Sequence, residues 1–211
     1  MTPPMHTLYG SQGSGSAAIE MALRAAGLPY TVVRASTWED DSAQAELRRV
    51  NPLGQIPTLV LPDGSVMTES AAILIHLGLT HPGLLPADAA ARAQALRGLV
   101  FIAANCYSAI SVGDYPERWT TAGTKPAQAK VRAAARVQLH RSWDILADSW
   151  AASPWLSGTQ PGALDFLAVV VSRWSGARAH LAASRPAFHA LLERLQAHPA
   201  IAPVWQAHWP G

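Results

Sequence analysis

The stretch that decides the fold is NPLGQIPTL at residues 51–59, and Glu69-Ser70 follow it at the start of an apolar segment. Its glycine-containing turn leads directly to Pro57, and proline lacks the backbone N–H that the interior of a sheet requires. Pro57 therefore belongs at the start of a strand, and Ile56-Pro57 is a candidate for a cis peptide bond. A cis bond would turn the Ile56 N–H and C=O out of the sheet, where they can pair with an extended ligand. Taken alone, the dipeptide is more typical of a tight turn without a ligand.

Glu69 and Ser70 immediately precede the apolar residues 71–79. The first backbone N–H groups of a helix lack intrahelical partners, so Ser70 can cap the helix. Alternatively, the N–H groups and the Ser70 hydroxyl hold a ligand carboxylate while Glu69 pairs with a ligand ammonium. Capping is the better interpretation of an isolated Glu-Ser pair. The spacing after the Ile-Pro turn favours the ligand.

Upstream of this stretch, the residues alternate between strand and helix patterns. Residues 6–9 and 30–33 read as strands, and residues 17–26 between them carry apolar side chains at helical spacing. Residues 39–50 are polar and helical or irregular. Residues 58–61 and 65–68 flank Pro-Asp-Gly, which is a hairpin turn. With the helix at 70–79, the predicted order is β-α-β-α-β-β-α.

Beyond a proline- and glycine-containing linker at residues 81–86, strand patterns disappear. Residues 88–112, 125–151, 163–179 and 186–197 read as helices. We therefore predict an α/β domain at residues 1–82 and an all-helical domain at residues 88–211.

Composition narrows the function. The chain has 211 residues, is 49% hydrophobic and carries a net charge of +2 without any Lys/Arg run, so nucleic acid is not an expected partner. A single cysteine excludes an internal disulfide and any multi-cysteine metal site, which fits a cytoplasmic protein. The apolar runs are too short to span a bilayer.

Together, residues 51–70 and the β-α-β-α-β-β-α order resemble the thioredoxin-like half of a cytosolic glutathione S-transferase. The helical remainder resembles that family's C-terminal domain. Its WLSG sequence at residues 155–158, followed by Ala163-Leu164-Asp165 at a helix start, is similar to the family's WLxG…AD region. Asp165 fits an acid that caps the helix start, although Gly162 stands where the family usually has Ser or Thr.

The resemblance implies that glutathione is the co-substrate and that no metal is needed. It assigns the cysteinyl unit to the Ile56-Pro57 backbone and the γ-glutamyl unit to Glu69 and Ser70. Gln55 is assigned more loosely to the glycyl end. Trp38 is a candidate for the same pocket, with a plain surface or core aromatic as the equal alternative.

Catalysis by this family requires a thiolate, and a free thiol has a pKa of about 8.5. Lowering that pKa by about two units takes about 2.7 kcal/mol. A hydrogen bond to the charged sulfur supplies about 1.5–3 kcal/mol, and a helix N-terminus adds about 0.3–1 kcal/mol. One hydroxyl at the start of the first helix is therefore sufficient.

The family carries that hydroxyl, or a cysteine, at the end of the first strand or in the next loop. Gly15 and Gly13 occupy the positions where beta-class and serine-type enzymes carry their catalytic residue. The class, whether serine-, tyrosine- or beta-like, therefore stays open. The candidate hydroxyls are, in order of preference, Ser11 and Ser14 together, then Tyr9, then Ser16, which is most simply a helix cap.

The second substrate is expected between the domains. Tyr107, Tyr115 and Trp119 are candidates for its apolar wall, although each is more often plain core. Cys106 is a candidate for the pocket border, although a small buried residue is the better interpretation.

We therefore expect a homodimeric transferase that acts in detoxification, in which the glutathione thiolate attacks a small hydrophobic electrophile. Two alternatives remain open on this fold: a glutathione-dependent isomerase or dehalogenase, and a non-catalytic glutathione-binding or regulatory protein.

Overall fold

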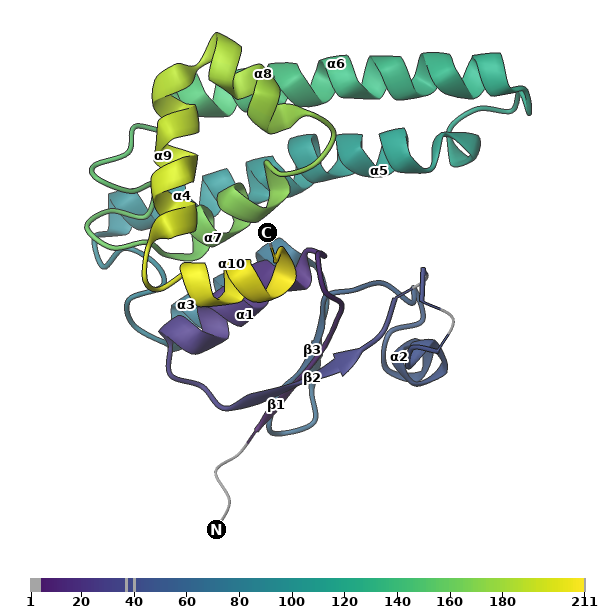
Figure 1. The fold of residues 1–211 in the computed structure, drawn as a ribbon. Helices are drawn as coiled ribbons and strands as arrows, with labels where there is room; N and C mark the ends of the chain where they lie inside the picture. Colours follow the sequence, from purple (N-terminus) through teal and green to yellow (C-terminus); the bar gives the residue numbers. More distant parts are fainter. Residues whose placement is uncertain (1–4, 37, 40, 211) are drawn as a thin grey trace.

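The computed structural model describes residues 5–36, 38–39 and 41–210. Its first part is a sheet with helices in the predicted β-α-β-α-β-β-α order (Figure 1). The elements are β1 (His6–Gly10), α1 (Ser16–Ala25), β2 (Tyr30–Arg34), α2 (Gln44–Val50), β3 (Thr58–Val60), β4 (Val66–Met67) and α3 (Ser70–Thr80).

The sheet has four strands in the order β2-β1-β3-β4. The strand β1 runs parallel to β2, from His6 opposite Tyr30 to Gly10 opposite Arg34, and antiparallel to β3. The predicted hairpin turn joins β3 to β4: Leu61 N–H donates to the Ser65 carbonyl over 2.8 Å, and Gly64 has a φ of 86°. That positive φ suits glycine.

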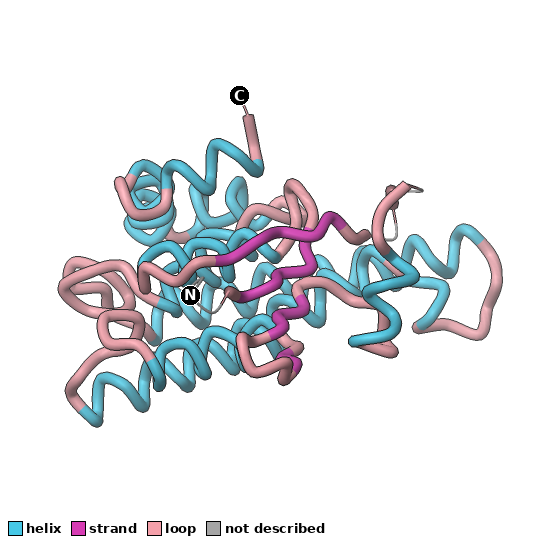
Figure 2. The backbone as a smooth tube through the Cα atoms, turned by 90° about the horizontal axis from the view of Figure 1, so that it is seen from below, coloured by secondary structure: helices cyan, strands magenta, loops and turns pink. Residues whose placement is uncertain are grey.

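The second part is helical (Figures 1 and 2). Its elements are α4 (Ala89–Phe101), the π-helical turn η1 (Ile102–Tyr107), α5 (Ser108–Asp114), the 3₁₀ turn η2 (Pro116–Arg118), α6 (Lys125–Ser149), α7 (Ala163–Val171), α8 (Ala177–Ser184), α9 (Pro186–Ala197) and α10 (Ala202–His208).

The predicted helix over 163–179 is wrong, because two helices occupy that range. The first, α7, ends at Val171, and Ser175 and Gly176 have φ angles of 55° and 77°, which a right-handed helix does not allow. Arg178 closes the end of α7 by donating to the Val169 carbonyl over 3.0 Å. Because of this break, the residues between α7 and α8 leave the axis of α7 instead of continuing the helix.

Every residue of α7 is buried, because α7 packs between α1 and α3 of the sheet part and α4 and α9 of the helical part. Its first turn is held by Asp165, whose carboxylate accepts backbone N–H groups from Leu156, Ser157 and Gly162 over 2.8, 2.9 and 3.1 Å. Gly162 cannot be Ser or Thr here, because a Cβ would lie 2.5 Å from the Leu84 carbonyl oxygen.

The expectation that no apolar segment is long enough to span a bilayer also needs correction. Residues Ala89–Asp114 form a continuous 26-residue helical run, and an 18-residue window within it has a mean hydropathy of 1.5. By length and composition alone, such a run could cross a membrane. The π-helical turn continues the helix instead of ending it. The run packs against α6 and α7, and a third of its most apolar 18-residue window is buried.

The helix α10, which the sequence pattern did not reveal, returns the chain to α1 (Figure 1). His208 lies at its end, with Nδ1 accepting from Gly13 N–H over 3.1 Å and Nε2 2.6 Å from Glu20. Gln12 also donates to the Ala207 carbonyl over 2.9 Å. The loop between β1 and α1 is therefore fixed by residues from the far end of the chain.

Candidate functional site

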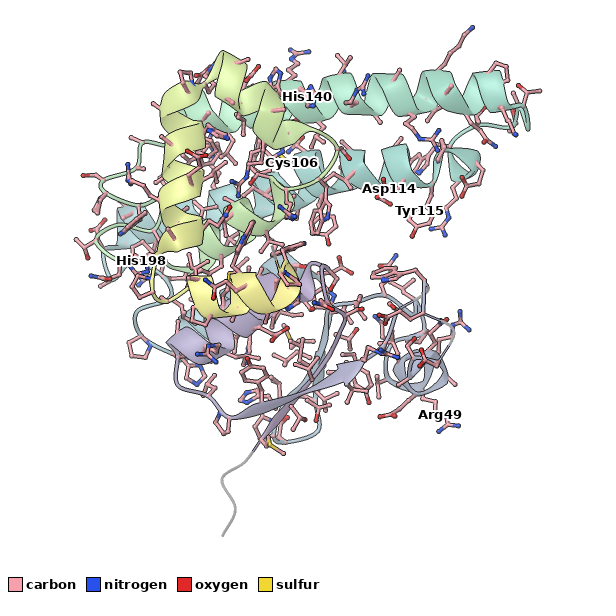
Figure 3. The ribbon with its side chains drawn as sticks, in the orientation of Figure 1. Arg49, Cys106, Asp114, Tyr115, His140 and His198 are labelled. Atoms are coloured by element: carbon pink, nitrogen blue, oxygen red, sulfur yellow. The ribbon has the colours of Figure 1, made fainter. Side chains whose placement is uncertain are left out.

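A cleft of about 640 Å³ lies between the sheet part and the helical part. Four segments of the sheet part line it: the loop at 13–15, residues 36 and 38, the turn at 51–57 and residues 68–71. The opposite wall comes from residues 103–118 and from Leu167 and Trp174. Figure 3 shows Asp114 and Tyr115 at the end of α5, on the side that faces the sheet part.

The turn at 51–57 has the predicted cis peptide bond between Ile56 and Pro57. Asn51 braces the turn, because its Nδ2 donates to the Gln55 carbonyl over 3.1 Å and to Thr58 Oγ1 over 2.9 Å. The described ladder pairs of β3 begin only at Thr58, so Ile56 presents its backbone outside the sheet. Ile56 lines the cleft. An extended ligand can therefore pair there as a strand would.

Glu69 and Ser70 meet the cleft at the start of α3. Glu69 is the N-cap residue and has a φ of 63°, a left-handed conformation that costs a non-glycine residue about 1–3 kcal/mol. Within the described part of the chain, neither the Glu69 carboxylate nor the Ser70 hydroxyl is assigned a hydrogen-bond partner. Ser70 therefore does not cap α3, and both side chains are available to a ligand beside the helix N-terminus.

Gln55, Pro57 and Trp38 also line the cleft, as the sequence led us to expect. Trp38 is 59% exposed, so it is a surface aromatic at the rim instead of a core residue. Its neighbour Ser36 also lines the cleft and was not anticipated.

Of the four candidate hydroxyls, only that of Ser14 belongs to a residue that lines the cleft, and Tyr9 lies away from it. Its side chain is buried in a small cluster with Ala35 and Leu47, and its hydroxyl donates to Glu46 Oε1 over 2.6 Å. Burial, with the Glu46 carboxylate beside it, raises the pKa of Tyr9 to about 12. Tyr9 therefore keeps its proton at neutral pH and does not reach the cleft lining.

The two serine candidates differ in position. Ser11 is buried and donates to Glu39 Oε2 over 3.0 Å, outside the cleft lining. Ser14 lines the cleft, but its Oγ donates to the Ser11 carbonyl over 2.7 Å and accepts from Ser16 N–H over 3.2 Å. Gly15, not Ser16, is the N-cap residue of α1.

On the helical wall, Tyr107 and Tyr115 line the cleft, whereas Trp119 and Cys106 are absent from its lining. Trp119 is 60% exposed. Cys106 is fully buried among the helices, as Figure 3 shows, and burial raises the pKa of its thiol to about 12.

The Cys106 thiol should therefore be inert in the folded protein. An ordinary thiol has a pKa of about 8.5, so Cys106 carries roughly 3,000-fold less thiolate at neutral pH. We expect Ellman's reagent to release no thionitrobenzoate from the native protein within minutes and one equivalent in denaturant. Prompt labelling of the native protein would show that Cys106 reaches solvent.

Trp174 is the most informative residue that the sequence did not reveal. The break between α7 and α8 places it in the cleft wall, where its ring packs against Tyr107 with the ring centroids 5.8 Å apart. Asp114 and Arg118 were missed as well. The Ser175-Gly176 dipeptide was the available signal, because such pairs favour a turn.

The fold and this cleft define a class, namely a thioredoxin-like sheet domain joined to a helical region. A family model described as "Glutathione S-transferase, N-terminal domain" matches residues 16–79. The uncharacterised GST-like protein YncG of Escherichia coli (strain K12) is 35% identical over 173 residues, which cover 81% of this chain and 82% of that protein. The chain therefore belongs to the cytosolic glutathione S-transferase family.

Solved structures agree with this assignment. A glutathione transferase homologue from Sulfitobacter with bound glutathione superposes with a TM-score of 0.83 at 25% identity, over 95% of this chain and 97% of that one. The bacterial glutathione transferase BphK, solved as a ternary complex, gives a TM-score of 0.77 at 27% identity, over 96% and 98% of the two chains.

Proposed function

We propose that this protein is a glutathione transferase that activates the glutathione thiolate for attack on a small apolar electrophile. One observation carries the proposal: the cis-proline turn and the start of α3 present unused binding groups to the same cleft. The relative from Sulfitobacter, which holds glutathione, supports it.

In this proposal, each part of glutathione has a matching group in the cleft. The Ile56 backbone pairs with the cysteinyl unit. Glu69 pairs with the γ-glutamyl ammonium, and Ser70 with the N-terminus of α3 holds the γ-glutamyl carboxylate. Gln55 lies toward the glycyl end, and Trp38 lines the same pocket. The positive φ of Glu69 is a strain that a binding role explains.

The reaction requires the thiol to lose its proton to solvent. The sulfur then donates an electron pair to an electrophilic carbon, and the new S–C bond displaces a leaving group that departs with its own bonding pair. The N-terminus of α1 borders the cleft at Gly15 and favours the negative sulfur. Among the sequence candidates, Ser14 is the one that the cleft exposes. Ser11 and Tyr9 lie outside the cleft lining.

The electrophile lies against the helical wall, where Tyr107, Tyr115 and Trp174 provide apolar and aromatic surface. Cys106 and Trp119 lie outside this surface and are not needed for the proposal.

Glutathione-dependent isomerisation is a second candidate function. A probable maleylacetoacetate isomerase from Caenorhabditis elegans is 37% identical over 95 residues, which cover 44% of this chain. The same thiolate would add to a substrate double bond and leave again, so the chemistry of the site is shared.

We further propose a cytoplasmic homodimer with a role in detoxification. In the single chain, only a third of the most apolar 18-residue stretch of Ala89–Asp114 is buried, and Val100 on this run is 55% exposed. A second copy packed on that run would cover it.

Turnover of chlorodinitrobenzene tests the proposal. We expect the purified protein with glutathione to form the dinitrophenyl conjugate well above the spontaneous rate, and S-methylglutathione to inhibit without supporting turnover. Maleylacetoacetate is assayed in parallel. Glutathione binding with no turnover of either substrate would favour the non-catalytic alternative and contradict the transferase.

A further inference from the structure

The three preferred hydroxyls that the sequence offered for thiol activation already have acceptors for their protons. Tyr9 donates to Glu46, Ser11 to Glu39 and Ser14 to the Ser11 carbonyl. A hydroxyl has only one proton to donate. Each would have to give up a hydrogen bond of 2.6–3.0 Å before it could stabilise a thiolate.

A different hydroxyl reaches the start of α1 from the helical part. The Tyr107 hydroxyl lies so close to Gly15 that a Cβ built on Gly15 would overlap it. Both residues line the cleft. Within the described residues, no hydrogen-bond partner is assigned to the Tyr107 hydroxyl. The hydroxyl therefore fills the space that a side chain on the N-cap residue of α1 would otherwise occupy.

Two features of the helical part hold Tyr107 in that position. Tyr107 is the last residue of η1, the π-helical turn between α4 and α5. A π-turn adds a residue to the helix and changes the direction of the side chains that follow, and such turns are frequent at functional sites. Trp174, which the break after α7 places in the cleft, packs against the Tyr107 ring.

From this geometry we propose that Tyr107 is a catalytic residue, whose hydroxyl donates a hydrogen bond to the glutathione sulfur beside the N-terminus of α1. The proposal rests on the proposed glutathione transferase function. It also explains why Gly15 occupies the position of a catalytic side chain: the hydroxyl comes from the helical part, and only glycine leaves room for it.

The surroundings keep Tyr107 a donor. Burial, with smaller contributions from the Asp114 and Glu69 carboxylates, raises the pKa of Tyr107 to about 12. Arg118 is the other charged group in the cleft lining. The phenol is therefore neutral near pH 7 and has a proton to share with the thiolate, whose own proton leaves to solvent.

Tyr107→Phe tests the proposal, because it removes the hydroxyl and keeps the ring on Trp174. Because the variant loses a hydrogen bond to a charged sulfur, kcat/KM should fall about 10- to 100-fold, the usual range for such a bond. The pKa of bound glutathione, read from thiolate absorbance, should rise by about one to two units. The rising limb of the pH–rate profile should move by the same amount, whereas the Kd for glutathione should change little.

The control is Tyr30→Phe, which removes a hydroxyl on β2 outside the cleft lining and should leave the thiol pKa unchanged. Ser14→Ala tests the loop alternative. If Ser14→Ala raises the thiol pKa and Tyr107→Phe does not, Tyr107 is not the donor. A wild type that fails to bind glutathione would instead refute the proposed function itself.

Gly15→Ala gives a second route should Tyr107→Phe not fold. The new Cβ displaces the hydroxyl, so the thiol pKa should rise and the melting temperature should fall. Combined with Tyr107→Phe, the same alanine should lower the melting temperature much less. The overlapping hydroxyl is then gone, the nearest remaining ring carbon, Cζ, lies 3.3 Å from the new Cβ, and the φ of −63° at Gly15 suits alanine. Equal destabilisation in both backgrounds would overturn the proposed contact.

Discussion

Replacing Asp165 with alanine should lower the free energy of unfolding by about 3 kcal/mol or more, the largest stability effect that we expect in this chain. The carboxylate is fully buried and accepts three backbone N–H groups that surround the start of α7. Each buried N–H without a partner costs about 1–3 kcal/mol. Burial raises the pKa of the Asp165 carboxyl, because a charge in an apolar environment is costly. Removing that charge recovers part of the free energy that the lost hydrogen bonds cost.

Asp148→Ala is the matched control for this variant. Asp148 binds Arg185 at the surface, with side chains 56% and 36% exposed, and such pairs contribute about 1 kcal/mol or less. Chemical denaturation at pH 7 compares the two variants directly. For a protein of this size, about 3 kcal/mol corresponds to a fall in Tm of roughly 6–12 °C. Equal losses in both variants would mean that Asp165 does not hold the start of α7.

Replacing Glu69 with glutamine should weaken glutathione binding about 10- to 100-fold, the largest effect that we expect on ligand affinity. A hydrogen bond between charged groups contributes about 1.5–3 kcal/mol, and glutamine keeps the shape while removing the charge. The left-handed conformation of Glu69 does not depend on that charge, so the fold should survive the change.

Two comparisons isolate the charge effect in this variant. Glu193→Gln changes an exposed carboxylate on α9, outside the cleft lining, and should leave the Kd unchanged. An analogue of glutathione without the γ-glutamyl amine should bind wild type and Glu69→Gln equally well, because the ammonium is then absent. If Glu69→Gln weakens both ligands equally, Glu69 acts through structure and not through the ammonium.

Much of the ligand side of this cleft could be predicted from sequence, because the relevant groups are close together in the chain. Pro57 is recognisable because it lacks a backbone N–H, and Glu69-Ser70 are recognisable because they directly precede an apolar helix. Such features depend on residues that are neighbours in sequence, so the turn and the helix start can be predicted without knowing the tertiary structure.

The proposed catalytic contact could not be predicted in this way, because it depends on residues far apart in the chain. Gly15 and Tyr107 come together only when η1 of the helical part meets the start of α1, and no spacing rule connects them. The π-helical turn that orients Tyr107 has no clear sequence signature. The residues that fix the 11–15 loop lie on α10, which the helical pattern did not reveal.

The most direct test of the central claim is calorimetric titration of the full-length wild-type protein with glutathione. The arrangement of the cis-proline turn and the start of α3 predicts saturable binding of one glutathione per chain, competed by S-methylglutathione and weakened by Glu69→Gln. No heat of binding at millimolar glutathione, from a protein whose circular dichroism shows it folded, would contradict the account.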